Sequence, residues 1–234
     1  AADYIGLGFV LIAMAVIFSA LTHSSGNFLN AQLPVTIANR IPKEIILAIG
    51  MTFVLLIGGI DLSVGSVMAL SGATAAWLIV TWQMPLSVAI LASLAVGATC
   101  GLINGLVTVR WKLPAFIVTL GMYQIAGGLA EQIANPTISI DPGVTNPLAV
   151  AFGGFAMSTP IALLLVVVAQ IVISYTVYGR YVIAVGTNEE AVRLSGIRPA
   201  RLQVSVFVIS GICAGMAALV SISETSTADP NAGS

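Results

Sequence analysis

Chemistry in this chain could centre on the run from Gly58 to Gly65, which reads Gly-Gly-Ile-Asp-Leu-Ser-Val-Gly. The adjacent glycines Gly58 and Gly59 loosen a helix because they carry no Cβ. The carboxylate of Asp61, with help from Ser63, can accept a backbone N–H at the start of the next helix. An ionisable side chain between two apolar segments can also mark a substrate site. The residues favour a helix cap at a structural hinge and leave direct substrate contact as the alternative.

The stretch from Tyr178 to Gln203 holds the second group of charged and capping residues. Its run Thr187-Asn188-Glu189-Glu190 fits a capping box, in which Thr187 caps a helix and Glu190 follows three residues later. A short helix is predicted to follow and to end at Gly196. Two interpretations remain open: a connector lying on the membrane, or a docking helix for a cytoplasmic partner.

Other catalytic and metal-binding sets are not expected. The chain has a single histidine, His23. A catalytic Ser-His-Asp set is therefore not credible, and one histidine cannot build a zinc site. Cys100 and Cys213 lie in apolar runs and are interpreted as packing residues. A phosphate loop of the G-x-x-x-x-G-K-S/T type is missing from the sequence, and Asp61 has no acidic partner in an adjacent apolar segment. We expect no enzyme activity, cofactor or metal, so energy must come from another subunit, or the protein is a passive channel.

These residues are embedded in a very apolar chain. Of its 234 residues, 58% are hydrophobic and 7% are charged, the net charge is −1 and the mean hydropathy is +1.06. A soluble domain carries about 25% charged residues, and a nucleic-acid-binding surface needs a basic patch. The composition therefore argues against both classes and is typical of an integral membrane protein.

Long gaps between charged residues predict an all-α, polytopic membrane protein. A spanning helix needs about 20 apolar residues. We expect a broken helix near 58–65, and an interfacial or half-inserted helix at 29–44 in which Arg40 can pair with Glu44. Residues 135–158 are expected to form a polar loop. About seven membrane segments are predicted, at 4–22, 45–60, 64–82, 86–109, 114–134, 159–177 and 203–222.

The basic residues predict the orientation of these segments. Arg110 and Lys112 lie between the fourth and fifth segments, and four arginines lie between the sixth and seventh. Loops rich in Lys and Arg stay in the cytoplasm, so these loops are expected inside and the 135–158 loop outside. Arg40 and Lys43 remain near the outer face, against this rule.

Small residues recur at four-residue spacing on two of the predicted spans. Gly97, Gly101 and Gly105 lie on the fourth span, and Gly211 and Gly215 lie on the seventh. Lipid supplies no hydrophobic force between helices, so such seams let backbones approach closely. We favour packing within the chain over a dimer interface as their role.

Three longer runs carry a family resemblance: GGIDLSVGSVMALSG at 58–72, GLINGLVTVRWKLPAFIVTLG at 101–121 and YGRYVIAVGTNEEAVRLSGI at 178–197. Together they resemble the permease subunits of bacterial ATP-binding-cassette (ABC) importers for ribose and related simple sugars, in the branched-chain amino acid/ribose permease superfamily. The resemblance covers the chain from about residue 26. Importers of this class have a coupling helix of the pattern E-A-A, three residues, then G. That pattern implies contact with the ATPase subunit through Glu189, Glu190, Ala191, Val192, Arg193 and Gly196, with Val192 replacing the second alanine.

The resemblance also implies the organisation of the chain. It predicts one transmembrane permease domain over 1–234, part of a larger type II importer permease fold, with a cytoplasmic coupling-helix loop at 178–203. Family members continue beyond a sequence like that at 226–233 into further spans. The chain is therefore expected to be truncated at its C-terminus.

The function implied is import of a ribose-like monosaccharide through a multi-pass protein of the bacterial cytoplasmic (inner) membrane. The expected partners are a cytoplasmic ABC ATPase, a periplasmic or extracellular sugar-binding protein, a second permease subunit (in a homodimer or heterodimer) and membrane lipid, with no nucleic acid. The alternatives are a related permease for branched-chain amino acids or nucleosides, and a membrane scaffold subunit that transports nothing. Candidates for the broken helix and the path are Gly58, Gly59, Asp61, Ser63, Gly65, Ser66, Ser71, Asn104, Thr119 and Gln124.

Overall fold

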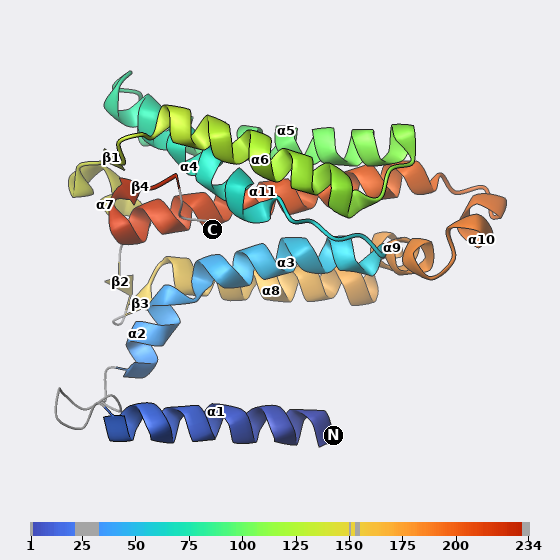
Figure 1. The fold of residues 1–234 in the computed structure, drawn as a ribbon, viewed down its shortest axis with the longest axis horizontal. Helices are drawn as coiled ribbons and strands as arrows, with labels where there is room; N and C mark the ends of the chain where they lie inside the picture. Colours follow the sequence, from blue (N-terminus) through green and yellow to red (C-terminus); the bar gives the residue numbers. More distant parts are fainter. Residues whose placement is uncertain (1, 22–32, 150, 153–154, 231–234) are drawn as a thin grey trace.

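The computed structural model describes residues 2–21, 33–149, 151–152 and 155–230. This part of the chain is mostly helical, and its short strands form two small antiparallel pairs (Figure 1). Strand β1 (Ile138–Ser139) pairs with β4 (Thr227–Ala228), and β2 (Ala151–Phe152) pairs with β3 (Phe155–Ala156). The helices are α1 (Ala2–Leu21), α2 (Leu33–Arg40), α3 (Pro42–Leu56), α4 (Val64–Val80), α5 (Leu86–Trp111), α6 (Ala115–Ile133), α7 (Pro142–Ala149), α8 (Ser158–Tyr175), α9 (Val177–Thr187), α10 (Glu189–Leu194) and α11 (Pro199–Thr225).

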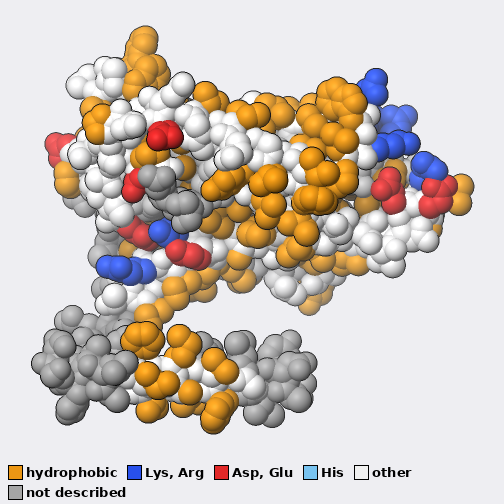
Figure 2. All heavy atoms as spheres, in the orientation of Figure 1, with side chains coloured by type: hydrophobic (Ala, Val, Ile, Leu, Met, Phe, Trp, Pro, Cys, Tyr) orange, Lys and Arg blue, Asp and Glu red, His pale blue; other side chains and the backbone are white. Residues whose placement is uncertain are grey.

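Each predicted membrane segment falls on a helix, in the order α1, α3, α4, α5, α6, α8 and α11. Among the described residues, α5, α8 and α11 are both long enough and apolar enough to cross a membrane, by length and composition. Exposed apolar side chains cover the middle of the bundle, whereas charged side chains gather toward its two ends (Figure 2). The prediction of an all-α membrane protein is confirmed.

The predicted helix at 29–44 is wrong in its extent, because the structure divides the segment into α2 and the first turn of α3, and residues 29–32 lie outside the described chain. Pro42 begins α3 at a position where its missing N–H costs nothing. The predicted pair between Arg40 and Glu44 is not among the ion pairs of the described residues. Instead, the Glu44 carboxylate lies 3.7 Å from the Lys43 ammonium.

Helix α11 packs along α5 through the two glycine seams. Gly97 and Gly211 abut so closely that a Cβ on either would collide with the backbone of the other. A Cβ on Gly105 would lie 2.8 Å from Val204 Cα, and one on Gly215 would lie 2.7 Å from the Ser93 carbonyl oxygen. The seams therefore serve packing within the chain, as predicted.

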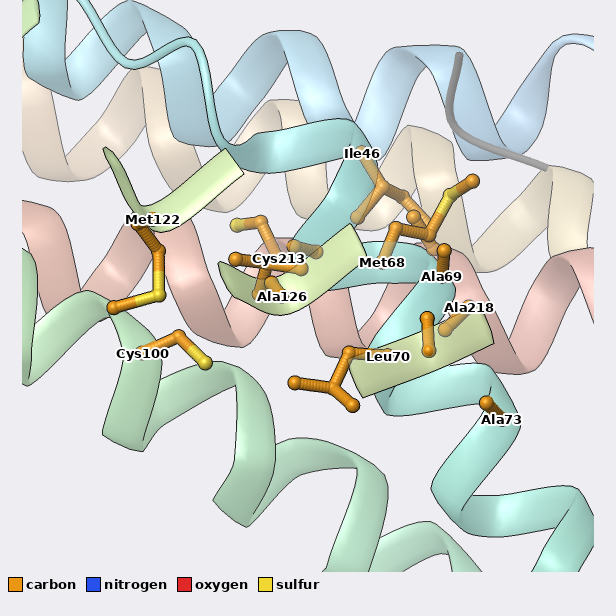
Figure 3. Packing of buried hydrophobic residues seen from close by; sticks show 14 of the residues in the cluster. Ile46, Met68, Ala69, Leu70, Ala73, Cys100, Met122, Ala126, Cys213 and Ala218 are labelled. Atoms are coloured by element: carbon orange, nitrogen blue, oxygen red, sulfur yellow. The ribbon is translucent and has the colours of Figure 1, made fainter. Parts of the chain in front are cut away.

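The main hydrophobic core lies where α3, α4, α5, α6, α8 and α11 meet (Figure 3). Alanine and glycine bring the helix backbones together, and larger side chains such as Ile46, Met68 and Met122 fill the remaining space. Cys100 and Cys213 are both buried in this core as free thiols, which confirms that they are packing residues.

The segments that connect the helices lie at the two ends of the bundle. The turn between α5 and α6 lies at the same end as α9 and α10, whereas α7 and the strand pairs lie at the opposite end (Figure 1). The loops that carry most of the basic residues are thus together, as predicted. The expected polar loop at 135–158 contains α7 and three of the short strands. Exposed tryptophans occur toward both ends, Trp111 at one and the Trp77–Trp82 pair at the other, as is typical of membrane interfaces.

Candidate functional site

The predicted broken helix is present between α3 and α4. Helix α3 ends at Leu56 and α4 begins at Val64, and residues 57–63 between them are not helical. Gly58 has a φ of +75°, a conformation that a residue with a side chain rarely adopts. The connection runs back along α3 into the bundle, so α4 begins in its interior (Figure 1).

Such a segment needs partners for its backbone, because lipid offers none. The Gly58 and Gly59 N–H groups donate to the carbonyls of Leu55 and Val54, at 2.9 and 3.0 Å. Thr119 of α6 serves two further groups with one hydroxyl. Its Oγ1 accepts from the Leu62 N–H at 3.1 Å and lies 3.2 Å from the Ile60 carbonyl, to which it can donate.

The Asp61 carboxylate is the centre of a buried polar network. Its Oδ1 accepts from both the backbone N–H and the hydroxyl of Ser63, at 2.9 and 2.6 Å. Its Oδ2 accepts from the Ser210 hydroxyl of α11 at 2.9 Å. The Asn104 amide of α5 in turn donates to Ser63 Oγ at 2.9 Å. All four side chains are buried, so hydrogen bonds rather than water stabilise the carboxylate.

The predicted capping of α4 by the Asp61 side chain is wrong in detail, because Ser63 is the N-cap residue and no side chain makes a cap hydrogen bond there. Asp61 instead orders the turn that leads into the helix. The carboxylate holds the N–H of Ser63, the residue directly before α4, while the Ser63 carbonyl accepts from the Val67 N–H at 2.8 Å. The α11 partner, Ser210, was not among the sequence candidates. It lies 149 residues from Asp61, and its one sequence signal is its position next to Gly211 in the seam.

The remaining path candidates divide by burial. Ser66, Ser71, Asn104 and Thr119 lie inside the bundle, and the Ser71 hydroxyl and the Asn104 carbonyl oxygen have no hydrogen-bond partner within the described chain. Gly59 is also buried and Gly65 is half-buried. Gly58 and Gln124 are exposed, the latter on the outer side of α6. The structure thus joins the break residues into one cluster and leaves Gln124 apart from it.

The second candidate site lies at the other end, around α10. The predicted cap is wrong by one residue: Asn188 caps α10 by accepting from the Ala191 N–H at 3.0 Å. Thr187 instead ends α9, where its hydroxyl donates to the Ile183 carbonyl. Asn188 adopts the extended backbone that a cap requires, and Asn is among the best capping residues. The predicted stop is confirmed by Gly196, which has a φ of +82°.

Helix α10 presents most of its side chains outward. Glu189, Glu190, Ala191 and Arg193 are exposed, and Leu194 is 80% exposed. Val192 is its one buried residue, and the helix as a whole contacts both α9 and α11. A pocket of about 570 Å³ opens between α9 and α10.

The charged residues of α10 form an exposed ion pair and a hydrogen bond to α11. Glu190 forms an ion pair with Arg193, and this pairing raises the pKa of the Arg193 guanidinium. Glu189 accepts a hydrogen bond from Gln203 of α11 at 3.0 Å. Tyr178 of α9 shares a second bond with Ser205 of α11, at 2.8 Å. Burial raises the pKa of the Tyr178 phenol, and that hydrogen bond partly opposes the effect. Both short helices are thus fixed to the base of α11.

Metal ligands do not gather anywhere in the described residues, where no group of three or more His, Cys, Asp and Glu side chains could hold an ion. His23 lies outside the described residues. The two sites therefore offer hydrogen bonds, one buried carboxylate and an exposed helix.

Comparison with known proteins gives these sites a context. The chain is 34% identical over 231 residues to the ribose import permease protein of Escherichia coli K12, covering 95% of this chain and 71% of that protein. It is 34% identical over 236 residues to the fructose import permease protein of Rhizobium meliloti, covering 96% and 64%. The D-allose transport system permease protein of Escherichia coli K12 is 32% identical over 234 residues, covering 99% and 71%. No solved structure matches the chain significantly.

A family model settles the assignment. The model of the family described as "Branched-chain amino acid transport system / permease component" matches residues 33–234, which include the broken helix, the glycine seams and α10. The chain belongs to this family of membrane transport permeases.

Proposed function

We propose that this chain is the transmembrane permease subunit of an ABC importer for a simple sugar. The observation that carries the proposal is the similarity, over almost the whole chain, to permeases named for ribose, fructose and allose. The protein sits in the bacterial inner membrane and is not itself an enzyme. A separate cytoplasmic ATPase supplies the work, a binding protein delivers the sugar outside, and a second permease subunit completes the path.

Helix α10 is the element that receives the work. Its buried Val192 and the Glu189–Gln203 hydrogen bond join it to α11, so a force on its exposed face reaches a long membrane helix. Glu190, Arg193 and Leu194 provide a charged and an apolar contact on that face. A rigid connection of this kind suits rocking of the helices around the path.

The polar network around Asp61 lies further along the same helix. Ser210 of α11 bonds Asp61, so the position of α11 is coupled to the broken helix. Weak, uncharged contacts suit a path that must bind a sugar and then release it. Gly58 and Gln124 are exposed and remain candidates for that path, and Ser66, Ser71, Asn104 and Thr119 reach a solute only if the helices separate.

The charge of the bundle interior favours a neutral cargo over an amino acid. Among the described residues, Asp61 is the one charged side chain that is buried, and its oxygens are already hydrogen-bonded. A zwitterionic amino acid would need partners for both of its charges. A sugar needs hydroxyl and amide groups, which the chain supplies.

The proposal is tested by uptake of radiolabelled ribose, fructose and leucine in cells that also carry the ATPase and the binding protein. We expect a sugar, and not leucine, to be taken up. Glu190→Lys should reduce uptake to background with normal membrane insertion, because it breaks the Arg193 pair and reverses the charge of the docking face. Glu131→Lys, an exposed reversal on α6, is the matched control and should retain uptake. Uptake of leucine alone, or normal uptake by Glu190→Lys, would contradict the proposal.

A further inference from the structure

Two adjoining spaces lie at the end of the bundle opposite α10. The first is an apolar groove of about 210 Å³ between α3, α5, α8 and α11, walled by Ile46, Leu94, Ile161 and Leu219 among others. The second is a pocket of about 550 Å³ between the start of α3 and the end of α11, and its walls include four charged side chains. Ser223 lines both, so the apolar groove opens toward the charged pocket.

The charged pocket contains two cations and two carboxylates. Lys43 and Glu44 pair at 3.7 Å, but Arg40 and Glu224 have no ion-pair partner within 4.0 Å among the described residues. Arg40, Lys43 and Glu44 line the same pocket as Glu224. The space between them is many times the roughly 30 Å³ that one water occupies in the liquid. A ligand with both a negative and a positive group could contact the cations and Glu224 at the same time.

The apolar groove restricts the ligand further. Its surface is almost entirely apolar, and it faces a region of the bundle that lies at membrane depth. Ser158 lines the groove, and its hydroxyl is buried and has no hydrogen-bond partner within the described chain. An occupant with an apolar tail and an acceptor within reach of Ser158 would suit both features.

Together these features describe one class of molecule. We propose that the groove and the pocket form a binding site for a single phospholipid with a phosphoethanolamine headgroup. The acyl chain lies in the groove, the phosphate contacts Arg40 and Lys43, and the ammonium contacts Glu224. An ester oxygen supplies the acceptor that Ser158 lacks. The pocket lies where α2 meets the first turn of α3, beside the last turn of α11, at the end of the bundle.

The headgroup decides the specificity of this site. Lipid tails are as apolar as the groove itself, so filling it distinguishes no lipid from another. Phosphatidylglycerol offers the phosphate without the ammonium and leaves Glu224 unpaired. Phosphatidylcholine keeps the positive charge but has no N–H group to donate to the carboxylate.

The test is native mass spectrometry of the purified full chain, exchanged into equimolar mixtures of the three lipids. We expect one retained phosphatidylethanolamine, preferred over each of the other two by about tenfold, the ratio that about 1.4 kcal/mol gives. Equal retention of all three lipids, or a preference for phosphatidylglycerol, would overturn the proposal. This comparison uses the unaltered protein and no transport assay, so its outcome is independent of the cargo.

Variants then locate the site. Glu224→Gln should remove the preference over phosphatidylcholine and phosphatidylglycerol, and Ile161→Trp should lower retention of every lipid because the larger ring fills the groove. Glu131→Gln and Arg110→Ala, which change charges away from both spaces, are the matched controls and should retain the preference. An unchanged preference in Glu224→Gln would show that the lipid binds elsewhere and would overturn the assignment.

Discussion

At the scale of single residues, the buried carboxylate of Asp61 organises the break between α3 and α4. Three hydrogen bonds from Ser63 and Ser210 converge on it, and each donor is itself buried. A buried donor that loses its acceptor costs about 1–3 kcal/mol. The network therefore has a defined energetic role whether or not a solute ever touches it.

The first prediction separates this role from one that needs the charge. Asp61→Asn should fold and transport, because the Asn carbonyl accepts the bonds from Ser63 and the Ser210 hydroxyl can turn to accept from the new amide. Asp61→Ala should lower the free energy of unfolding by about 1–3 kcal/mol, because it leaves the donors unpaired. Thermal unfolding in detergent and sugar uptake measure the two effects. Loss of uptake by a well-folded Asp61→Asn would show that the negative charge itself is needed.

The sequence predicted the hydrogen-bonding partners close to Asp61 in the chain, but not the distant partner on α11. Asp61, Ser63 and the glycines lie within one short run, where capping rules apply directly. Ser210 is 149 residues away, and its contact depends on how α11 packs against the break. Local capping rules contain no information on that packing.

At the scale of elements, the glycine seams determine how closely α5 and α11 approach. The backbone of Gly211 occupies the space where a side chain on Gly97 would stand, and the reverse also holds. Other glycines on the membrane helices, such as Gly121 of α6, have open space around them. Spacing alone identified the seams, and the structure shows that they face each other.

The second prediction uses that contrast. Gly211→Ala should destabilise the protein by about 1–3 kcal/mol, because its methyl group must displace the backbone of α5. Gly121→Ala, the matched control, meets nothing within 4 Å and should be neutral or stabilising, since Ala is the better helix former. Thermal unfolding of the two variants in detergent measures the difference. Equal unfolding temperatures would contradict the close packing of α5 and α11.

Helix α9 is an element that the sequence did not predict. Its two glycines, Gly179 and Gly186, disfavour a helix when the sequence is considered alone. In the structure they allow close contact instead: a Cβ on Gly186 would collide with the Leu56 carbonyl, and one on Gly179 with the end of α8. A glycine needed for packing and a glycine that ends a helix are identical in the sequence.

At the scale of the whole molecule, the two ends of the bundle have different chemistry. One end carries α10 and the basic turns, and the other carries the mixed-charge pocket and the strand pairs (Figures 1 and 2). The order of the membrane segments followed from the gaps between charges, because each long apolar run must form a helix. The central position of α11 could not be predicted in this way, because all the runs are apolar and none of them indicates which helices it packs against.

The central claim is that α10 faces the cytoplasm and receives work from a separate ATPase. The most direct measurement is thiol labelling of Leu194→Cys, a position that is 80% exposed, in a chain whose own cysteines are buried. Thr137→Cys, an exposed position directly before β1 at the opposite end of the bundle, is the matched control. We predict that a membrane-impermeant maleimide labels position 137 in intact cells and position 194 only in inside-out vesicles. Adding the ATPase subunit to vesicles that lack it should then reduce the labelling of position 194. Labelling of position 194 from outside intact cells would contradict the claim.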